Sequence, residues 1–253
     1  MHAARNERNK PLMSIKPPIA QQMPLPIQLR ASSVFASYCA GQNQQALNVL
    51  QDLRSSGPNP VIFLYGSGAV GKTHLLQAAC VSVAQQKMQV GYFPLSELHQ
   101  YGTELLQGAE QMDLVCLDDV GAVLHVKEWC LALFNLYRQL EERGAKMLLA
   151  DEQSPAALKI ALPDLASRIL AGTVLRVQSL DEGGQTEALC MHAKLRGLIL
   201  SEEVLSYLLR RLPRDMHILC DFIDHLDLAS LASQRKLTIP FVKEVLLQTG
   251  YAV

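Results

Sequence analysis

The sequence lacks the long apolar run that a membrane helix requires. No stretch of its 253 residues reaches the roughly 18 apolar side chains needed to cross a bilayer. Residues 1–10 are polar and charged, without the apolar centre of a secretory signal peptide. We therefore expect a cytoplasmic protein that makes no contact with a membrane.

Paired cysteines and an excess of positive charge are also missing. None of the six cysteines forms a CxxC pair, which argues against a zinc site or a redox motif, so we expect reduced thiols, mainly in the core. The net charge is −1, whereas a module that held DNA through phosphate contacts alone would be basic. The net charge argues against strong autonomous DNA binding, although it leaves room for a local basic patch.

Proline is concentrated at the beginning of the chain. Five prolines fall within residues 1–30, at positions 11, 17, 18, 24 and 26. Because proline removes backbone donors and blocks regular structure, we predict an extended tail over residues 1–30. The whole composition, 49% apolar and 19% charged, is that of a globular protein.

Short apolar runs alternate with helical patterns in the middle of the chain. Strands are predicted at 61–65, 90–94, 114–117, 146–150 and 174–177. Helices are predicted at 43–54, 71–86 and 128–144. This alternation predicts an α/β core, residues 31–180, with a parallel five-stranded sheet and helices on both faces.

Strand signals fade after about residue 180. Helical patterns follow at 186–196, 201–212 and 215–231. Ser201 is placed to cap the second of these helices, and Thr238 is placed to cap a last one. We predict a small all-helical lid over residues 181–253.

A glycine-rich loop lies between the first predicted strand and the helix after it. It matches G-x-x-x-x-G-K-[ST] and consists of Gly66, Ser67, Gly68, Ala69, Val70, Gly71, Lys72 and Thr73. Glycines allow backbone N–H groups to surround phosphate oxygens at a helix N-terminus. Lys72 would bring a charge to the outer phosphates, and Thr73 a hydroxyl to Mg²⁺. The loop predicts a nucleotide site.

The third predicted strand ends in two acids, Asp118 and Asp119. An apolar strand that ends in a carboxylate downstream of such a loop is the Walker B pattern. Asp118 would hold the Mg²⁺ shell, and Asp119 would orient or deprotonate a water molecule. Because efficient hydrolases of this class often carry Glu at the second position, we expect weak or partner-dependent ATP hydrolysis.

Three further features have two interpretations from the residues alone. Arg168 and Arg214 are either ordinary surface arginines or phosphate contacts. The segment 22–27 is either a passive proline-rich tail or a stiff peptide that docks in a hydrophobic groove; its residues are Gln22, Met23, Pro24, Leu25, Pro26 and Ile27.

Taken together, these residues resemble the AAA+ module of the DnaA family of bacterial replication initiators, and more closely a regulator within that family. The resemblance runs over about residues 20–247. It rests on the glycine-rich loop, on residues 162–168 (LPDLASR), on residues 214–216 (RDM) and on residues 232–244 (ASQRKLTIPFVKE). It implies that the nucleotide is ADP or ATP.

The resemblance also assigns roles to residues. Arg168 matches the finger that reaches a nucleotide on a neighbouring subunit, and Arg214 matches the sensor 2 arginine of the lid. Val34 and Phe35 match the stretch that lies near the base. Asp151 and Glu152 fall in the sensor 1 region, but sensor 1 stays open because the sequence departs there from the Ser-Asp-Arg-Pro-Pro pattern of the initiator. The residues that match a motif for binding the sliding clamp of DNA polymerase are Gln22, Met23, Leu25, Pro26 and Ile27.

The function implied is regulation of replication initiation. Together with the DNA-loaded clamp, the protein would promote hydrolysis of ATP bound to DnaA and so inactivate the initiator; it could also form homo-oligomers. One alternative is a self-sufficient AAA+ ATPase that acts as a loader or motor. The other is a DNA-binding initiator, which the near-neutral charge and the lack of room for a helix-turn-helix after the lid argue against.

Overall fold

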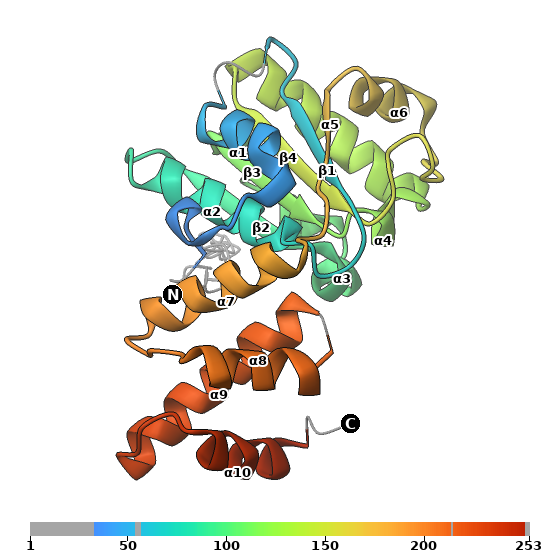
Figure 1. Cartoon of the computed structure of the whole chain (residues 1–253). Coiled ribbons are helices and arrows are strands. Elements are labelled where there is room, and N and C mark those ends of the chain that lie inside the picture. The colour runs from blue at the N-terminus through green and yellow to red at the C-terminus, as the bar shows by residue number, and fades with distance from the viewer. Residues whose placement is uncertain (1–32, 54–56, 214, 251–253) are drawn as a thin grey trace, which may run out of the picture.

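The computed structural model describes residues 33–53, 57–213 and 215–250 (Figure 1). Its centre is a five-stranded sheet in the order β2-β3-β4-β1-β5. The strands are β1 (Val61–Tyr65), β2 (Val90–Pro94), β3 (Leu114–Asp118), β4 (Lys146–Asp151) and β5 (Thr173–Arg176). Every pair is parallel, so the predicted fold class and the five predicted strands are confirmed to within one residue at each end.

The register of the sheet sets the position of the loops that follow the strands. Tyr65 lies opposite Asp151 on one side and opposite Arg176 on the other. Pro94 lies opposite Asp118 in the neighbouring pair of strands. The carboxyl ends of all five strands therefore meet at one edge, which is where α/β proteins of this kind place their ligands.

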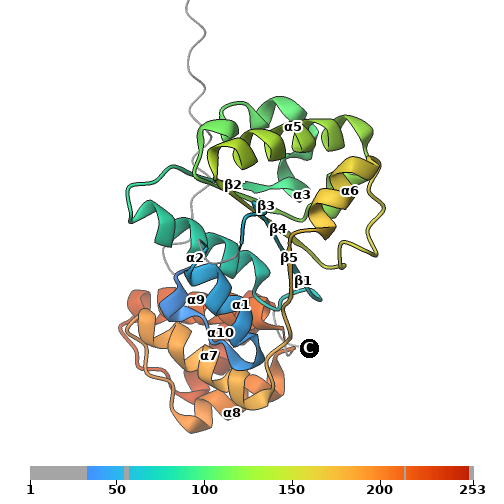
Figure 2. The same ribbon diagram turned by 90° about the horizontal axis from the view of Figure 1, so that it is seen from above.

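Helices cover both faces of the sheet (Figure 2). On one face lie α1 (Gln44–Gln51) and α2 (Lys72–Ala84); on the other lie α5 (Lys127–Arg143) and α6 (Pro163–Leu170). Shorter pieces are α3 (Leu95–Leu98), α4 (Gly121–Leu124) and five 3₁₀ turns, at Phe35–Ser37, Gly41–Asn43, His99–Tyr101, Thr103–Leu106 and Ala109–Gln111. Each face has its own apolar cluster, so the sheet is buried on both sides, as its continuous apolar strands predict.

The C-terminal part is a helical lid with a separate apolar cluster. Its helices are α7 (Glu182–Leu195), α8 (Glu202–Arg211), α9 (Met216–Ser233) and α10 (Ile239–Thr249). The predicted cap at Ser201 is confirmed, since its side chain accepts a hydrogen bond from the Val204 amide. Thr238 stands at the N-cap of α10, but its side chain makes no capping bond, so that part of the prediction is wrong.

Two helices differ most from the sequence-based expectation, whereas α1 ends at Gln51, three residues before its predicted end. α7 begins at Glu182, four residues before the predicted start, because the Asp181 side chain accepts a hydrogen bond from the Gly184 amide at 2.8 Å and fixes the first turn despite its glycines. α6 was not predicted as a helix. Its apolar side chains Leu165 and Ile169 are buried against the sheet, and this tertiary packing supports a helix of only eight residues.

Two expectations from composition can be compared with the structure. All six cysteines are free thiols, and four of them are buried, whereas Cys190 is exposed and Cys220 is half-buried. In the part of the chain that the structure describes, no helix is both long and apolar enough to span a membrane.

Candidate functional site

The glycine-rich loop joins β1 to α2 at the carboxyl edge of the sheet. Gly71 precedes α2 with φ 93°, a left-handed conformation that favours glycine. The Lys72 side chain is only 7% exposed. Its Nζ donates to the carbonyl oxygens of Gly66 and Ser67 at 2.8 and 2.9 Å. The ammonium is therefore held inside the loop, where an anion bound at the α2 N-terminus would meet it.

Gly66 is the point at which the loop touches Val177, the residue that follows β5. A Cβ atom at this position would lie 2.1 Å from the Val177 carbonyl oxygen, which is part of the backbone and has little freedom to move. The Val177 amide also donates to the Tyr65 carbonyl at 2.7 Å. The glycine thus allows β5 and the loop to pack closely, independently of any role in phosphate binding.

Gly66→Ala is expected to lower the free energy of unfolding by about 1–3 kcal/mol, the usual effect of overpacking. Urea denaturation measures it. Gly183→Ala is the matched control, because the nearest atom to a Cβ there is Asp181 Oδ1 at 3.6 Å. The control should change stability by less than about 0.5 kcal/mol, as most surface substitutions do. Equal stability of both variants would contradict the assigned contact.

Asp118 ends β3 next to the loop and is 2% exposed. Its Oδ2 accepts hydrogen bonds from Thr73 Oγ1 at 2.6 Å and from the Tyr92 hydroxyl at 2.9 Å. Burial raises the pKa of Asp118, and these two hydrogen bonds oppose the shift. The pairing of Thr73 with Asp118 unites the two sequence motifs in one cluster of oxygen atoms. Tyr92 was not foreseen, since nothing in the sequence of β2 marks it.

Asp119 is held differently from its neighbour. Its φ of 54° is in the left-handed region, which turns the chain out of the sheet. Its Oδ2 accepts a hydrogen bond from Ser96 Oγ at 2.7 Å. Asp119 is half-buried and lines the same cavity as Asp118. The carboxylate therefore points toward the space in which a water molecule could be activated.

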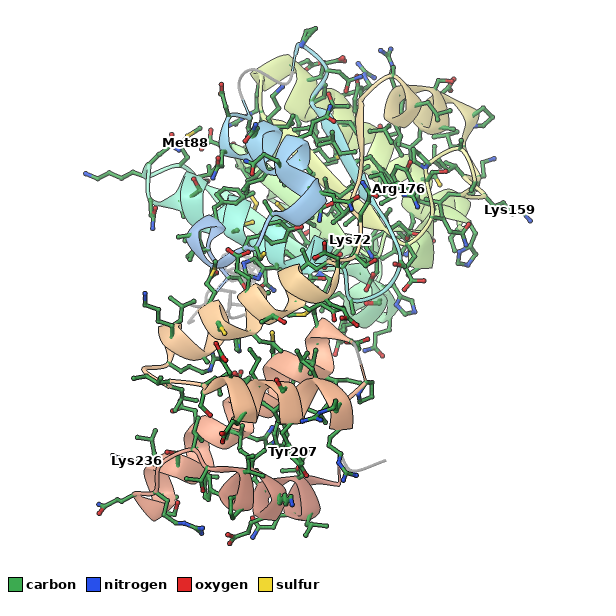
Figure 3. All side chains as sticks on the ribbon, viewed as in Figure 1. Lys72, Met88, Lys159, Arg176, Tyr207 and Lys236 are labelled. Carbon is green, nitrogen blue, oxygen red and sulfur yellow. The ribbon has the colours of Figure 1, made fainter. Side chains whose placement is uncertain are left out.

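A cavity of about 780 Å³ opens at this edge, between the core and the lid. Lys72 lies at this boundary, next to α7 (Figure 3). The loop contributes Gly68 to Thr73, and α9 contributes Met216, His217 and Cys220. Other walls come from α2, β2, β3 and α7, and their polar members include Gln77, Tyr92, Gln185 and His192. Such a volume is typical of a site for a small organic ligand.

The segment before α1 forms a further wall. Ser33, Ser37, Tyr38 and Cys39 line the cavity; Val34 and Phe35, the predicted residues of this stretch, are not among the lining residues. Val34 acts instead through its carbonyl oxygen, which lies 3.1 Å from Nε2 of His74, a half-buried histidine of α2. Burial lowers the pKa of His74.

Comparisons with known proteins identify the core. Residues 29–176 match the family model for the bacterial DnaA ATPase domain. The chain belongs to the DnaA family of AAA+ proteins. Residues 181–246 match a second model, described as the lid domain of Hda. The second match covers the four lid helices almost completely.

Solved structures share this DnaA-family fold. Domain III of the Thermotoga maritima DnaA superposes with a TM-score of 0.74 at 20% identity, over 88% of this chain and 98% of that one. AMPPCP-bound DnaA from Aquifex aeolicus gives 0.67 at 25% identity, over 81% and 68%. A Thermotoga maritima RuvB mutant gives 0.59 at 12% identity, over 81% and 68%, which shows the fold alone.

Asp151 ends β4 and Glu152 follows it, in the stretch that the resemblance compares with sensor 1. Asp151 is buried and accepts hydrogen bonds from the amides of Gly121 and Gln153 at 2.6 and 3.0 Å. Its carboxylate therefore supports the backbone. Glu152, in contrast, lines the cavity, and its Oε1 is 3.2 Å from where a Cβ on Gly68 would lie. Of the two acids, Glu152 is the one that faces the loop.

The lid side of the DnaA-family site is organised by Asp224 on α9. Its two oxygens contact His192 Nε2 of α7 at 2.7 Å and Nη2 of Arg196, the C-cap residue of α7, at 2.6 Å. This arrangement fixes His192 at the cavity wall. Arg214, the predicted sensor 2 residue, lies outside the described residues, although Pro213 and Asp215 line the cavity.

Arg168 lies apart from this cavity. It is exposed on α6, and its guanidinium carbon is 5.6 Å from the centroid of the Tyr137 ring on α5. The sheet separates α5 and α6 from α1 and α2 (Figure 2). The predicted clamp-binding residues Gln22, Met23, Leu25, Pro26 and Ile27 lie outside the described residues.

Proposed function

We propose that this DnaA-family protein regulates replication initiation by promoting hydrolysis of ATP bound to DnaA. In this proposal it is tethered through residues 22–27 to a sliding clamp loaded on DNA, and it presents Arg168 to the ATP site of DnaA. DnaA with ADP would then be inactive. The match of its C-terminal helices to the Hda lid model supports a role within initiation control.

The observation that carries the proposal is the position of Arg168. The guanidinium is exposed on α6 and does not line the cavity between the core and the lid of this protein. An arginine so placed can act on a nucleotide only if another subunit brings that nucleotide to it. Stacking on the Tyr137 ring contributes about 0.5–1 kcal/mol at an exposed site. It holds the guanidinium in place without a competing ion pair among the described residues.

The cavity of the protein itself would hold an adenine nucleotide with Mg²⁺. The α2 N-terminus and Lys72 supply positive charge for the phosphates. Thr73 and Asp118 offer the hard oxygen ligands that Mg²⁺ prefers. No cluster of three metal-ligating side chains occurs in the described residues, and none is needed, since Mg²⁺ in such sites takes its other ligands from phosphates and water. A bound ion would neutralise phosphate charge.

Lys72→Ala is expected to weaken ADP or ATP binding at least about tenfold, which corresponds to about 1.4 kcal/mol. The reason is the loss of the one ammonium that the loop carbonyls hold at the phosphate position. Isothermal titration calorimetry measures the change. Lys87→Ala is a suitable control, because Lys87 lies beyond the other end of α2. Equal nucleotide affinity of wild type and Lys72→Ala would show that Lys72 does not bind phosphate.

A self-sufficient ATPase that acts as a loader or motor is the second candidate function. The geometry of Asp119 favours it, because its carboxylate is fixed by Ser96 at the cavity wall next to Asp118. This function requires robust ATP turnover by the protein alone. The regulator needs only weak or partner-dependent hydrolysis, and its own nucleotide would mainly set the angle between core and lid.

Hydrolysis of ATP preloaded on DnaA tests the proposal. The assay is a single turnover with and without this protein, in the presence of DNA-loaded clamp. We expect stimulation only when both the protein and the loaded clamp are present. Stimulation that does not need the clamp would remove the tether from the proposal. Absence of stimulation, together with fast ATP turnover by the protein alone, would favour the loader or motor.

The proposal also covers contact with DNA, location in the cell and oligomeric state. Contact with DNA is mainly indirect, through the clamp, and the site of action is the cytoplasm. A homo-oligomer is compatible with Arg168, since a second copy could present its own nucleotide to this arginine.

A further inference from the structure

One face of the lid brings two cations to a single aromatic ring. The Arg211 guanidinium carbon is 5.8 Å from the centroid of the Tyr207 ring, and Lys243 Nζ is 5.7 Å from it. Tyr207 lies between α8 and α10 (Figure 3). Arg210, the residue before Arg211, is also exposed. We refer to Tyr207, Arg210, Arg211 and Lys243 as the lid basic patch.

No ion pair of Arg211 or Lys243 with an acid is found within the described part of the lid. The acid that follows Lys243 on α10 is Glu244, and its Oε2 is occupied by Arg235 Nη1 at 2.8 Å. The positive charge of the patch is therefore available to a ligand, even though the whole chain has a net charge of −1.

The dipole of α8 explains the positions of the two arginines of the patch but not the position of the lysine. Arg210 and Arg211 lie in the last turn of α8, where cations interact favourably with the helix dipole. Lys243 lies inside α10, away from its C-terminal turn, so this reason does not apply to it. Two like charges beside one ring repel each other, and a bound polyanion would relieve this repulsion.

We infer that the lid basic patch binds the phosphate backbone of duplex DNA. The choice of DNA rests on the proposed function, which places the protein at a clamp that encircles duplex. Both cations flank one ring, so a ligand with closely spaced negative charges, such as successive phosphates of a DNA strand, can contact both. Phosphate contacts of this kind position a protein on DNA without reading its sequence.

A contact with two or three phosphates is weak by itself. It gains strength when another part of the protein is already held on the same DNA, because tethering raises the effective concentration to the millimolar range. The patch would thus act after clamp binding and would orient the lid, and with it the core, relative to the DNA. This is a direct DNA contact in addition to the indirect one through the clamp.

Fluorescence anisotropy with labelled duplex DNA, in the absence of clamp and DnaA, tests the inference. The test variant combines Arg211→Gln with Lys243→Gln, which keeps stems that can cover Tyr207. The slope of log affinity against log salt should become less negative by about 0.9 for each lost phosphate contact, so by about 1.8 for the pair. A charge-conserving variant, Arg211→Lys with Lys243→Arg, should retain the wild-type slope.

The control variant combines Arg138→Gln with Lys159→Gln. Both side chains are exposed on the core, far from the lid, and the change in net charge is the same. An equal loss of DNA affinity in the test and control variants would show general electrostatics and overturn the inference. Unchanged DNA binding, with weaker binding to DnaA or to DNA-free clamp, would make the patch a protein-docking surface and also overturn it.

The measurement of duplex binding and the measurement of ATP hydrolysis by DnaA can fail independently of each other. If the wild type stimulates DnaA but the test variant binds duplex as well as the wild type does, only the inference about the lid fails. If duplex binding depends on the patch but DnaA is not stimulated, the DNA contact stands and the regulatory role fails.

Discussion

Arg168→Ala should abolish the stimulation of ATP hydrolysis by DnaA, a loss of about a thousandfold or more in the stimulated rate if the arginine acts in trans as in GTPase activation. The fold should be unaffected, because the side chain is exposed and its one aromatic contact, with Tyr137, is weak. The melting temperature should stay within a few degrees of the wild type. Clamp binding and the affinity of the protein for its own nucleotide should also be unchanged.

Arg168→Lys extends this test. Lysine keeps the charge but loses the planar fork that matches phosphate oxygens, so stimulation should still be impaired. Arg138→Ala is the control, since Arg138 is another exposed arginine on the same side of the sheet. Single-turnover hydrolysis of ATP preloaded on DnaA, with clamp and DNA present, measures all three variants. Full stimulation by Arg168→Ala would refute the trans role and direct attention to another surface of the core.

Replacing Gln22, Leu25 and Ile27 together with Ala should lower the affinity for the clamp by at least about a hundredfold, which would abolish binding in practice. Each buried aliphatic side chain contributes about 1.5–3 kcal/mol when it leaves water, and the prolines between them reduce the cost of ordering the peptide. Nucleotide binding should stay intact, because these residues lie outside the predicted core. Binding to immobilised clamp, measured by surface plasmon resonance, gives the result.

The matched control for the tail removes the same kinds of side chain from its other part. Ile15, Ile19 and Gln21 replaced with Ala should leave clamp affinity within about twofold of the wild type, a difference of less than about 0.5 kcal/mol. If the variant at Gln22, Leu25 and Ile27 still co-elutes with clamp at wild-type affinity, the tail is a linker. Regulation of DnaA would then need another means of reaching DNA.

The sheet and the phosphate loop could be predicted because their signals are local. Val61–Tyr65 is a continuous apolar strand, the glycines follow at once, and α2 begins at Lys72. The pairing of Thr73 with Asp118 was implied by the two motifs together, since parallel strands end at one edge. The helices of the lid also had clear apolar spacing, and only the start of α7 was misplaced.

The contacts that complete the site could not be predicted in this way. Tyr92 donates to Asp118 from a neighbouring strand, and Ser96 donates to Asp119 from a short helix. Both pairs are more than twenty residues apart in sequence, and no repeated spacing marks them. The same is true of the lid: His192 and Cys220 line the cavity because α7 and α9 pack across its mouth. Only tertiary packing brings these residues together at the site.

The cavity has walls from parts of the chain that keep separate apolar clusters. Local opening of the lid and binding of a ligand are therefore linked equilibria, because an open lid removes part of the binding surface. At a hundred times its dissociation constant, a ligand that requires both walls adds about 2.7 kcal/mol to the free energy of opening. Amide protons of α7 and α9 would exchange roughly a hundredfold more slowly when that ligand is abundant. The fraction of molecules with an open lid would thus fall as the nucleotide concentration of the cell rises, with no change in the folded structure.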